Sequence, residues 1–148
     1  MRPAPQVRLA TASDAPAVAR LSAEWGYPTS EALALTRLER VLSSPSHVVL
    51  VAEVDDTPAG WASAEVRLSL GSDPRVEITG LVVAAEFRRT GIGRLLVAHV
   101  EQWTAEKRCR ELFLRSNVAR AEAHPFYECL GYERTKTQHA YRKVLHAA

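Results

Sequence analysis

The chain has 148 residues, a length that predicts one domain spanning residues 1–148. Hydrophobic residues make up 47% of it and charged residues 24%, the composition of a globular protein with a buried core. The net charge of +2 and the scattered Lys and Arg residues argue against nucleic acid or an anionic membrane surface as a partner.

The cysteines and the N-terminus bear on metal binding and location. Cys109 and Cys129 form no CxxC pair, and no Cys/His cluster has zinc-ligand spacing, so we expect no metal site. The N-terminal residues contain no apolar signal core, and no stretch is long and apolar enough to span a membrane. We therefore expect a reduced protein in the cytosol.

The first third of the chain predicts a strand and two helices. Residues 7–9 alternate as a short strand does. A helix is expected to start at residues 11–14, with Ser13 as its N-cap, and to end near Glu24. A second helix should begin near Ser30, because Leu33, Leu38 and further apolar residues follow at helical spacing.

The rest of the chain predicts strands first and βαβ connections afterwards. Residues 48–54, 60–70 and 76–83 read as strands joined by turns, and a helix should start near Gly91. A strand is expected at residues 111–115, a helix at 119–130 closed by Gly131, and one or two closing strands at 132–145. This order predicts an α/β protein with a mixed sheet and helices on its faces.

Residues 81–96 form the strongest functional pattern. An apolar strand runs into a short loop, and Gly91-x-Gly93 then opens an amphipathic helix. Glycines let backbone N–H groups turn toward an anion, and the helix N-terminus adds partial positive charge. Full charges come from Arg88, Arg89 and Arg94. The stretch predicts a pyrophosphate site; the alternative is a tight strand-to-helix turn with a solvated rim of arginines.

Two common nucleotide motifs fit this stretch poorly. A P-loop needs Gly-Lys-Ser/Thr, but Gly93 is followed by Arg94 and Leu95. A Rossmann fingerprint needs a third Gly or Ala where the chain has Leu96, and it belongs near the start of a βαβ unit. A nucleotide-binding α/β protein is therefore disfavoured.

Another pattern matches closely at two places. Arg88-x-x-Gly91-x-Gly93 resembles the Q/R-x-x-G-x-G/A motif of the GNAT superfamily of N-acetyltransferases. Downstream, Asn117 is followed at residues 123–132 by A-H-x-F-Y-E-x-x-G-Y, which resembles a later segment of small bacterial members. The two motifs lie in the expected order, and the order of strands and helices agrees with that fold. The resemblance implies an acyl-CoA N-acyltransferase fold, with a mostly antiparallel central sheet flanked by about four helices.

The resemblance also implies a reaction and a donor site. An amine would attack the thioester of acetyl-CoA directly in a ternary complex, and no metal would take part. A catalytically silent acyl-CoA-binding or sensor domain of the same fold is the alternative. The residues implied to contact the cofactor are Leu81, Val82, Val83, Arg88, Arg89, Thr90, Gly91, Ile92, Gly93, Arg94, Asn117 and Tyr127.

Two catalytic residues are suggested by the same resemblance. Tyr127 is the candidate general acid for the CoA thiolate, because a phenol has a pKa near ~10; its alternative role is a partly buried aromatic. Glu77, unusual in a central strand, is the candidate general base, with a surface ion pair as the alternative. Asn117 would contact the cofactor arm or cap a turn.

The acceptor is the least determined part of the prediction. Trp25 and Tyr27, at the junction of the first two helices, would line the acceptor pocket or plug the junction. The sequence leaves open an aminoglycoside, an amino acid, a polyamine, a peptide or a protein as the amine acceptor, and it leaves the acyl-chain preference open. Because dimers are common in the resembled superfamily, we expect a homodimer.

Overall fold

A computed structural model of the chain describes residues 3–120 and 122–146. The chain divides into two compact units, Met1–Arg115 and Ser116–Ala148, which are described separately below. None of the helices in the described ranges has the length and apolar run that crossing a bilayer requires.

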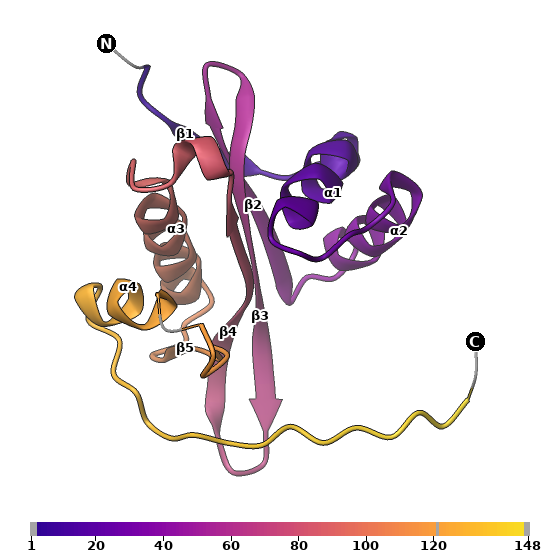
Figure 1. Cartoon of the computed structure of the whole chain (residues 1–148). Coiled ribbons are helices and arrows are strands. Elements are labelled where there is room, and N and C mark those ends of the chain that lie inside the picture. The colour runs from indigo at the N-terminus through magenta and orange to yellow at the C-terminus, as the bar shows by residue number, and fades with distance from the viewer. Residues whose placement is uncertain (1–2, 121, 147–148) are drawn as a thin grey trace. The chain divides into compact units, whose positions relative to one another are not determined.

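A five-stranded sheet forms the centre of the first unit (Figure 1). Its strands lie in chain order, and every neighbouring pair is antiparallel except the last, β4 with β5, which is parallel. The strands are β1 (Gln6–Leu9), β2 (His47–Val54), β3 (Thr57–Ser69), β4 (Ser72–Val83) and β5 (Leu112–Leu114). A mostly antiparallel mixed sheet is therefore confirmed.

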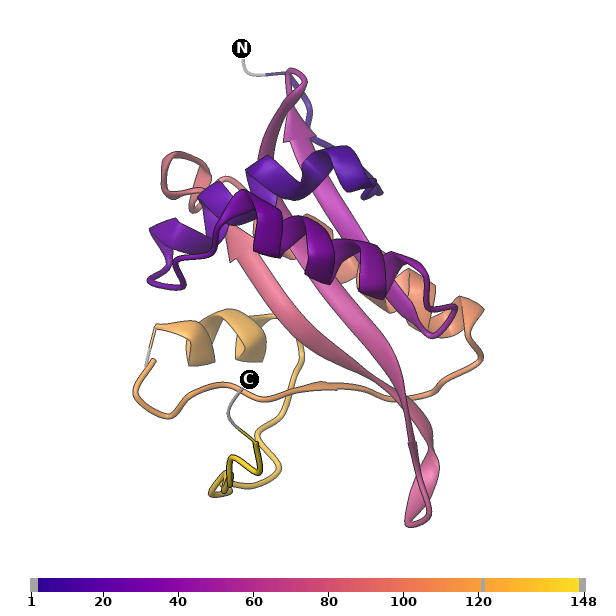
Figure 2. The ribbon, with the colours of Figure 1, turned by 90° about the vertical axis from the view of Figure 1, so that its right-hand side faces the viewer.

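Helices cover both faces of this sheet. α1 (Ala15–Glu24) and α2 (Glu31–Leu42) lie on one face, and α3 (Ile92–Glu106) lies on the other (Figures 1 and 2). Single 3-10 turns, η1 (Ala12–Asp14) and η2 (Ala85–Phe87), precede α1 and lead toward α3. The second unit contributes α4 (Ala123–Cys129). With four helices and a mixed sheet, the fold class predicted from the sequence is confirmed.

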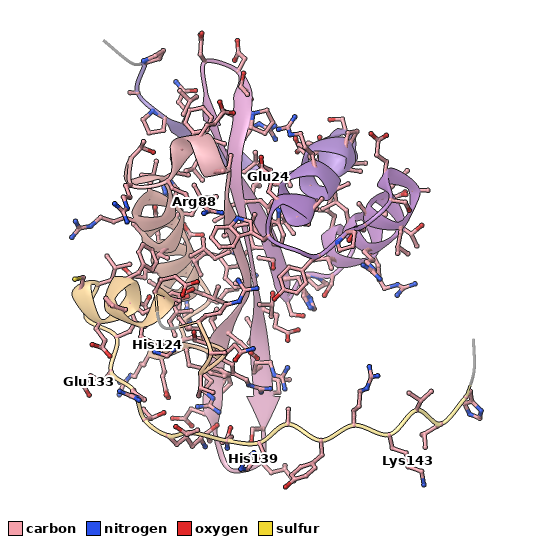
Figure 3. All side chains as sticks on the ribbon, viewed as in Figure 1. Glu24, Arg88, His124, Glu133, His139 and Lys143 are labelled. Carbon is pink, nitrogen blue, oxygen red and sulfur yellow. The ribbon has the colours of Figure 1, made fainter. Side chains whose placement is uncertain are left out.

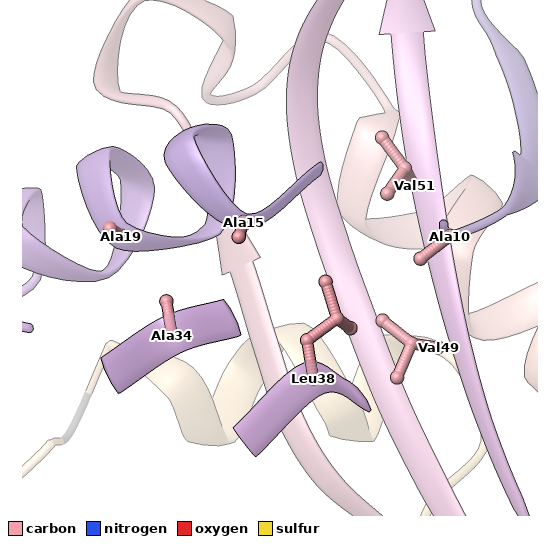
Figure 4. Close-up of a cluster of buried hydrophobic side chains, with 7 residues drawn as sticks. All are labelled: Ala10, Ala15, Ala19, Ala34, Leu38, Val49 and Val51. Carbon is pink, nitrogen blue, oxygen red and sulfur yellow. The ribbon is translucent and has the colours of Figure 1, made fainter. Parts of the chain in front are cut away.

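Small side chains let α1 and α2 pack closely on the sheet. Four alanines, Leu38 of α2 and two valines of β2 form one buried cluster (Figure 4). Its members are Ala10, Ala15, Ala19, Ala34, Leu38, Val49 and Val51. Because each alanine adds little volume, the helix axes can approach the strands, and the larger side chains Val18, Val41 and Trp61 pack at the edge.

Two irregularities in β4 shape the site. Ser63 pairs with Gly80 and Ala64 pairs with Ile78, so Thr79 is an extra residue that forms a β-bulge. In addition, β4 pairs with β5 only over Val76–Ile78. Residues 80–83 of β4 consequently pair with β3 alone, and β5 does not use their other backbone edge.

The start of α1 differs from the prediction. Ser13 is not the N-cap; it lies inside η1, and Asp14 immediately precedes α1. The carboxylate of Asp14 accepts a hydrogen bond from the backbone N–H of Thr11 at 2.8 Å and is held by Arg8 at 2.7 Å. Because this carboxylate closes a tight first turn, the N-cap of the α-helix is Asp14, one residue later than expected. The predicted N-cap at Ser30 is confirmed, since its hydroxyl accepts from Leu33 N–H at 3.1 Å.

The second unit corrects two predictions. α4 begins at Ala123 because Asn117 forms a turn first, accepting from Ala119 N–H through its side chain at 2.9 Å. The predicted closing strands are wrong: in the described residues 132–146 no strand forms, since this unit holds no second strand to complete a ladder. Gly131, with φ of +92°, follows α4 as the helix stop that the sequence predicts.

Candidate active site

Gly91, in the left-handed backbone conformation, precedes the N-terminus of α3 and leaves it without a side-chain cap. Gly91 precedes the helix with φ of +90°, a conformation that side-chain-bearing residues rarely adopt. As a glycine it has no side chain to cap the first turn, so the leading N–H groups of α3 stay available to a ligand. A 15-residue helix carries a partial positive charge at this end, and the geometry suits an anion.

The side chains around Gly91 divide into one anchor and several exposed groups. Ile92 is 1% exposed and packs into the core, which fixes the start of α3. The hydroxyl of Thr90 donates to the carbonyl of Phe87 and tightens the loop. Arg88, Arg89, Thr90 and Arg94 are exposed, and Gly93 is half-buried. The loop thus presents three guanidinium groups and a helix N-terminus together.

The end of α1 holds the segment that leads into this loop. The indole N–H of Trp25 donates to the carbonyl of Val83 at 2.9 Å, and the guanidinium of Arg88 lies 3.9 Å from the centre of the Trp25 ring. The carboxylate of Glu24 accepts from Ala85 N–H at 3.3 Å. Glu24 and Arg88 are labelled in Figure 3, at the end of the sheet where β4 finishes. Tyr27, by contrast, is 57% exposed.

Glu77 is a buried carboxylate within a row of charged side chains. It is 7% exposed, and its oxygens lie 3.6 Å from Arg67 and 3.5 Å from Arg115. Glu65 is opposite Glu77 in the β3–β4 register and lies 2.9 Å from Arg67 and 2.7 Å from His47. We call these five residues the charge row. The sequence suggested Glu77 as a general base, with a surface ion pair as the alternative, but it did not indicate the other members of the row, because strand register is needed to see them.

A cavity of about 230 Å³ lies between α1, α2 and the sheet. We call it the α2 cavity. Its apolar wall includes Trp61, and its polar lining consists of Ser22, Thr29, Arg37, His47, Ser63 and Thr79. The Ser63 and Thr79 hydroxyls are 2.8 Å apart, across the bulge in β4. The sequence did not indicate these hydroxyls, since no motif marks them.

Comparison with known protein families assigns this arrangement. Residues 15–132 match the model of the acetyltransferase (GNAT) family. The chain belongs to the GNAT acetyltransferase family. The enzyme class predicted from the two motifs, an acetyl-CoA-dependent N-acetyltransferase, is thereby confirmed.

Several relatives of this GNAT acetyltransferase are named aminoglycoside N(6')-acetyltransferases. It is 29% identical to aminoglycoside N(6')-acetyltransferase type 1 of Stenotrophomonas maltophilia, over 90% of this chain and 89% of that one. The protein of the same name from Serratia marcescens is 30% identical, over 73% of this chain and 77% of that one. Aminoglycoside N-acetyltransferase AAC(6')-Iy, solved in complex with CoA, shares the fold with a TM-score of 0.85 and 24% identity, covering 95% of each chain.

The second unit of this GNAT acetyltransferase holds Asn117 and Tyr127. Burial raises the pKa of Tyr127 above its ordinary value of 10, so its phenol stays protonated at neutral pH. The Tyr127 ring makes edge contacts with Phe126 and Tyr132, at centroid distances of 5.1 and 6.1 Å. The side-chain oxygen of Asn117 is already engaged in the turn with Ala119.

Two further observations concern other chemistries. Among the described residues, no group of three or more His, Cys, Asp or Glu side chains could hold a metal ion. Cys129 is exposed and Cys109 is buried, and neither is in a disulfide.

Proposed function

We propose that this GNAT acetyltransferase transfers the acetyl group of acetyl-CoA to a primary amine of a small molecule or peptide, by direct attack within a ternary complex. The observation that carries the proposal is the N-terminus of α3, left without a side-chain cap by Gly91 in the left-handed region. In the chain, η2 and a short loop connect this helix to the end of β4, whose second edge β5 leaves unpaired. An anion site and a free backbone edge are what a CoA thioester needs.

The diphosphate of the donor would bind at the start of α3. Backbone N–H groups of residues 91–94 would donate to its oxygens, and the exposed guanidinium groups would neutralise its charge. Arg88 is held in place by its stacking on Trp25. The residues assigned to this part of the site are Arg88, Arg89, Thr90, Gly91, Ile92, Gly93 and Arg94.

The acyl-bearing arm would lie along the free edge of β4. Leu81, Val82 and Val83 pair with β3 and not with β5, so their second backbone edge would take the pantetheine amides, apart from the Val83 carbonyl, which accepts from Trp25. A backbone N–H from this segment would donate to the thioester oxygen as negative charge develops there. The side chain of Val82 is buried in the core, and its backbone would form hydrogen bonds with the ligand.

Glu77 would take the proton of the attacking ammonium group. It is a buried carboxylate on the strand that carries the thioester segment, and Arg67 and Arg115 fix its position from two sides. A carboxylate can accept the proton directly or through one water molecule. The competing role is a purely structural member of the charge row.

Tyr127 would supply the proton to the departing thiolate, with Asn117 binding the cofactor arm. The phenol of Tyr127 is protonated at neutral pH, as a general acid must be before the step, and burial keeps its pKa above 10. A homodimer and a cytosolic location remain predictions from the sequence.

Calorimetry with acetyl-CoA, ATP and NAD tests the donor site first. We expect micromolar binding of acetyl-CoA only, lost in Gly91→Glu, which places a carboxylate where the diphosphate would bind. Gly91→Gln is the matched control: it carries the same strain at φ of +90° without the charge, and it should retain more affinity. No acetyl-CoA binding by the folded protein would refute the proposal. Binding without acceptor-dependent thiol release from any amine would instead support a catalytically silent acyl-CoA sensor.

A further inference from the structure

The α2 cavity is lined by hydrogen-bond donors and by no acidic residue. Among the described residues that line it, none is Asp or Glu, whereas Arg37 contributes a guanidinium group. Arg37 forms no ion pair with any described residue. A guanidinium group is a fork of N–H donors that matches a carboxylate in shape and charge.

Trp61 forms part of the apolar wall of the same cavity. Its indole Nε1 is buried and has no hydrogen-bond partner among the described residues. A buried N–H without a partner costs free energy, and native proteins usually satisfy such a group with protein, water or ligand. The far edge of the Trp61 ring is fixed, because it lies over Gly80, where an added Cβ would come within 2.6 Å of it. The ring is therefore held in one place.

The carboxylates of the charge row beside the cavity do not make this region attractive to a polycation. Its two carboxylates, Glu65 and Glu77, already lie within salt-bridge distance of Arg67 and Arg115. Counted together, the charge row and the lining of the α2 cavity contain three arginines and two carboxylates. A polycation would meet net positive charge here and would gain little from carboxylates that are already paired.

The size of the cavity sets a further limit. At about 230 Å³ it is smaller than the roughly 300–1,000 Å³ of pockets that bury drug-sized ligands. A carboxylate with a short carbon chain fits such a volume, whereas an aminoglycoside would remain mostly outside. Trp61 pairs with Val82 in the β3–β4 register, so a group bound against Trp61 lies beside the strand segment proposed to hold the thioester.

We propose that the α2 cavity binds the carboxylate of a small amine acceptor, so that the acceptor is an amino-acid-like amine and not a polycationic aminoglycoside. Arg37 pairs with the carboxylate, and the carbon chain of the acceptor packs against the ring of Trp61. The inference rests on the proposed acetyl transfer and names the acceptor class for it. It assigns this chain an acceptor that differs from the aminoglycosides for which its relatives are named.

Matched acceptor pairs test the inference by turnover. L-lysine and cadaverine differ only in the carboxylate, as do L-phenylalanine and phenethylamine, and kanamycin is the polycation. With acetyl-CoA and the full chain, thiol release should show at least about tenfold higher kcat/KM for the carboxylate-bearing member of a pair. Arg37→Gln should remove that preference. Arg40→Gln, which removes a neighbouring exposed charge of α2 outside the cavity, should keep it.

An NMR readout keeps the test decisive where none of these amines is turned over. The chain has three tryptophans, so its ¹⁵N spectrum should hold three indole signals, and Trp61→Phe identifies the one from Trp61. In the presence of CoA, lysine or phenylalanine should shift that signal, and cadaverine, phenethylamine and kanamycin should not.

The outcomes separate this inference from the proposed function. Kanamycin or the decarboxylated amines acetylated as well as the amino acids would overturn the inference and leave the acetyltransferase intact. So would a Trp61 signal that none of the amines shifts in a protein that binds acetyl-CoA. Failure to bind acetyl-CoA in the calorimetric experiment would refute the proposed function itself.

Discussion

The indole N–H of Trp25 donates a 2.9 Å hydrogen bond to the backbone carbonyl of Val83, which joins the end of α1 to the end of β4. The same ring carries Arg88 on its face at 3.9 Å. One side chain from the helix junction therefore supports both the last residue of β4 and Arg88. We call residues 88–94, proposed to bind the diphosphate, the anion loop. The sequence suggested that Trp25 lines an acceptor pocket or plugs the helix junction, whereas these contacts connect it to the loop that precedes α3.

Replacing Trp25 by phenylalanine should weaken this support. The Val83 carbonyl loses its partner while a ring remains for Arg88, so we expect a loss of about 1–2 kcal/mol in the free energy of unfolding. Because the segment leading to the loop is held less firmly, the dissociation constant for acetyl-CoA should rise several-fold. Denaturant unfolding and calorimetry measure the two effects. Trp103→Phe, in α3, is the control and should leave the acetyl-CoA affinity unchanged.

Glu77→Gln should lower kcat/KM by about 100-fold or more at pH 7, if Glu77 is the general base. An alkyl amine with a pKa near ~10.4 is almost fully protonated at that pH and needs the base. As the pH rises toward 10, the amine supplies its own free-base form, and the deficit of the variant should shrink. A pH–rate profile of both proteins with the same acceptor measures this.

Glu65→Gln is the matched control for that experiment. Glu65 lies opposite Glu77 and shares Arg67 with it, so its removal disturbs the charge row to a similar extent. We expect less than a tenfold loss and an unchanged pH profile. Equal losses in the two variants, with parallel profiles, would mean that Glu77 only positions its neighbours.

The sequence predicted those parts of the fold that local patterns encode. Apolar alternation and turn residues located β1 to β4, and Ser30 and Gly91 marked the starts of α2 and α3. The start of α1 was misplaced because it depends on Arg8, a residue of β1 that reaches Asp14. The closing strands were overpredicted because alternation shows that a segment can pair, but not that a partner strand is present.

The candidate site was predicted in a similar, partial way. The anion loop is contiguous in sequence, so its glycines and arginines could be recognised together. The charge row and the α2 cavity combine residues from three or more elements, and only the register of the strands brings them to one face. The bulge at Thr79, which brings its hydroxyl to Ser63, leaves no mark in the sequence.

Asp14→Asn should destabilise the fold in a pH-dependent way. Hydrogen bonds from Arg8 and from Thr11 N–H lower the pKa of Asp14 below its ordinary value of 3.8. A lowered folded-state pKa gives stability that is fully present above the unfolded value and is lost as the pH falls through the folded one. Because Arg8 is 38% exposed, solvent screens the pair, and we expect a difference of about 1–2 kcal/mol at pH 6.

Acid unfolding curves check this prediction. The difference between wild type and Asp14→Asn should be constant from pH 5 to 7 and should decline below about pH 4. Asp73→Asn, which changes an exposed carboxylate at the start of β4, is expected to show no comparable loss. A stability difference that persists unchanged at pH 2 would mean that Asp14 acts through packing and not through its charge.

Tyr127→Phe tests the proposed general acid. Removal of the hydroxyl should lower kcat by about 100-fold, with little change in acetyl-CoA affinity, because the proton is needed only as the thiolate departs. Since burial raises the pKa of Tyr127 above 10, ionisation of this phenol should not reduce the wild-type rate below pH 10. A wild-type decline between pH 8 and 9 that disappears in Tyr127→Phe would contradict that assignment. Tyr141→Phe, which changes an exposed phenol in the second unit, is the control and should leave kcat unaltered.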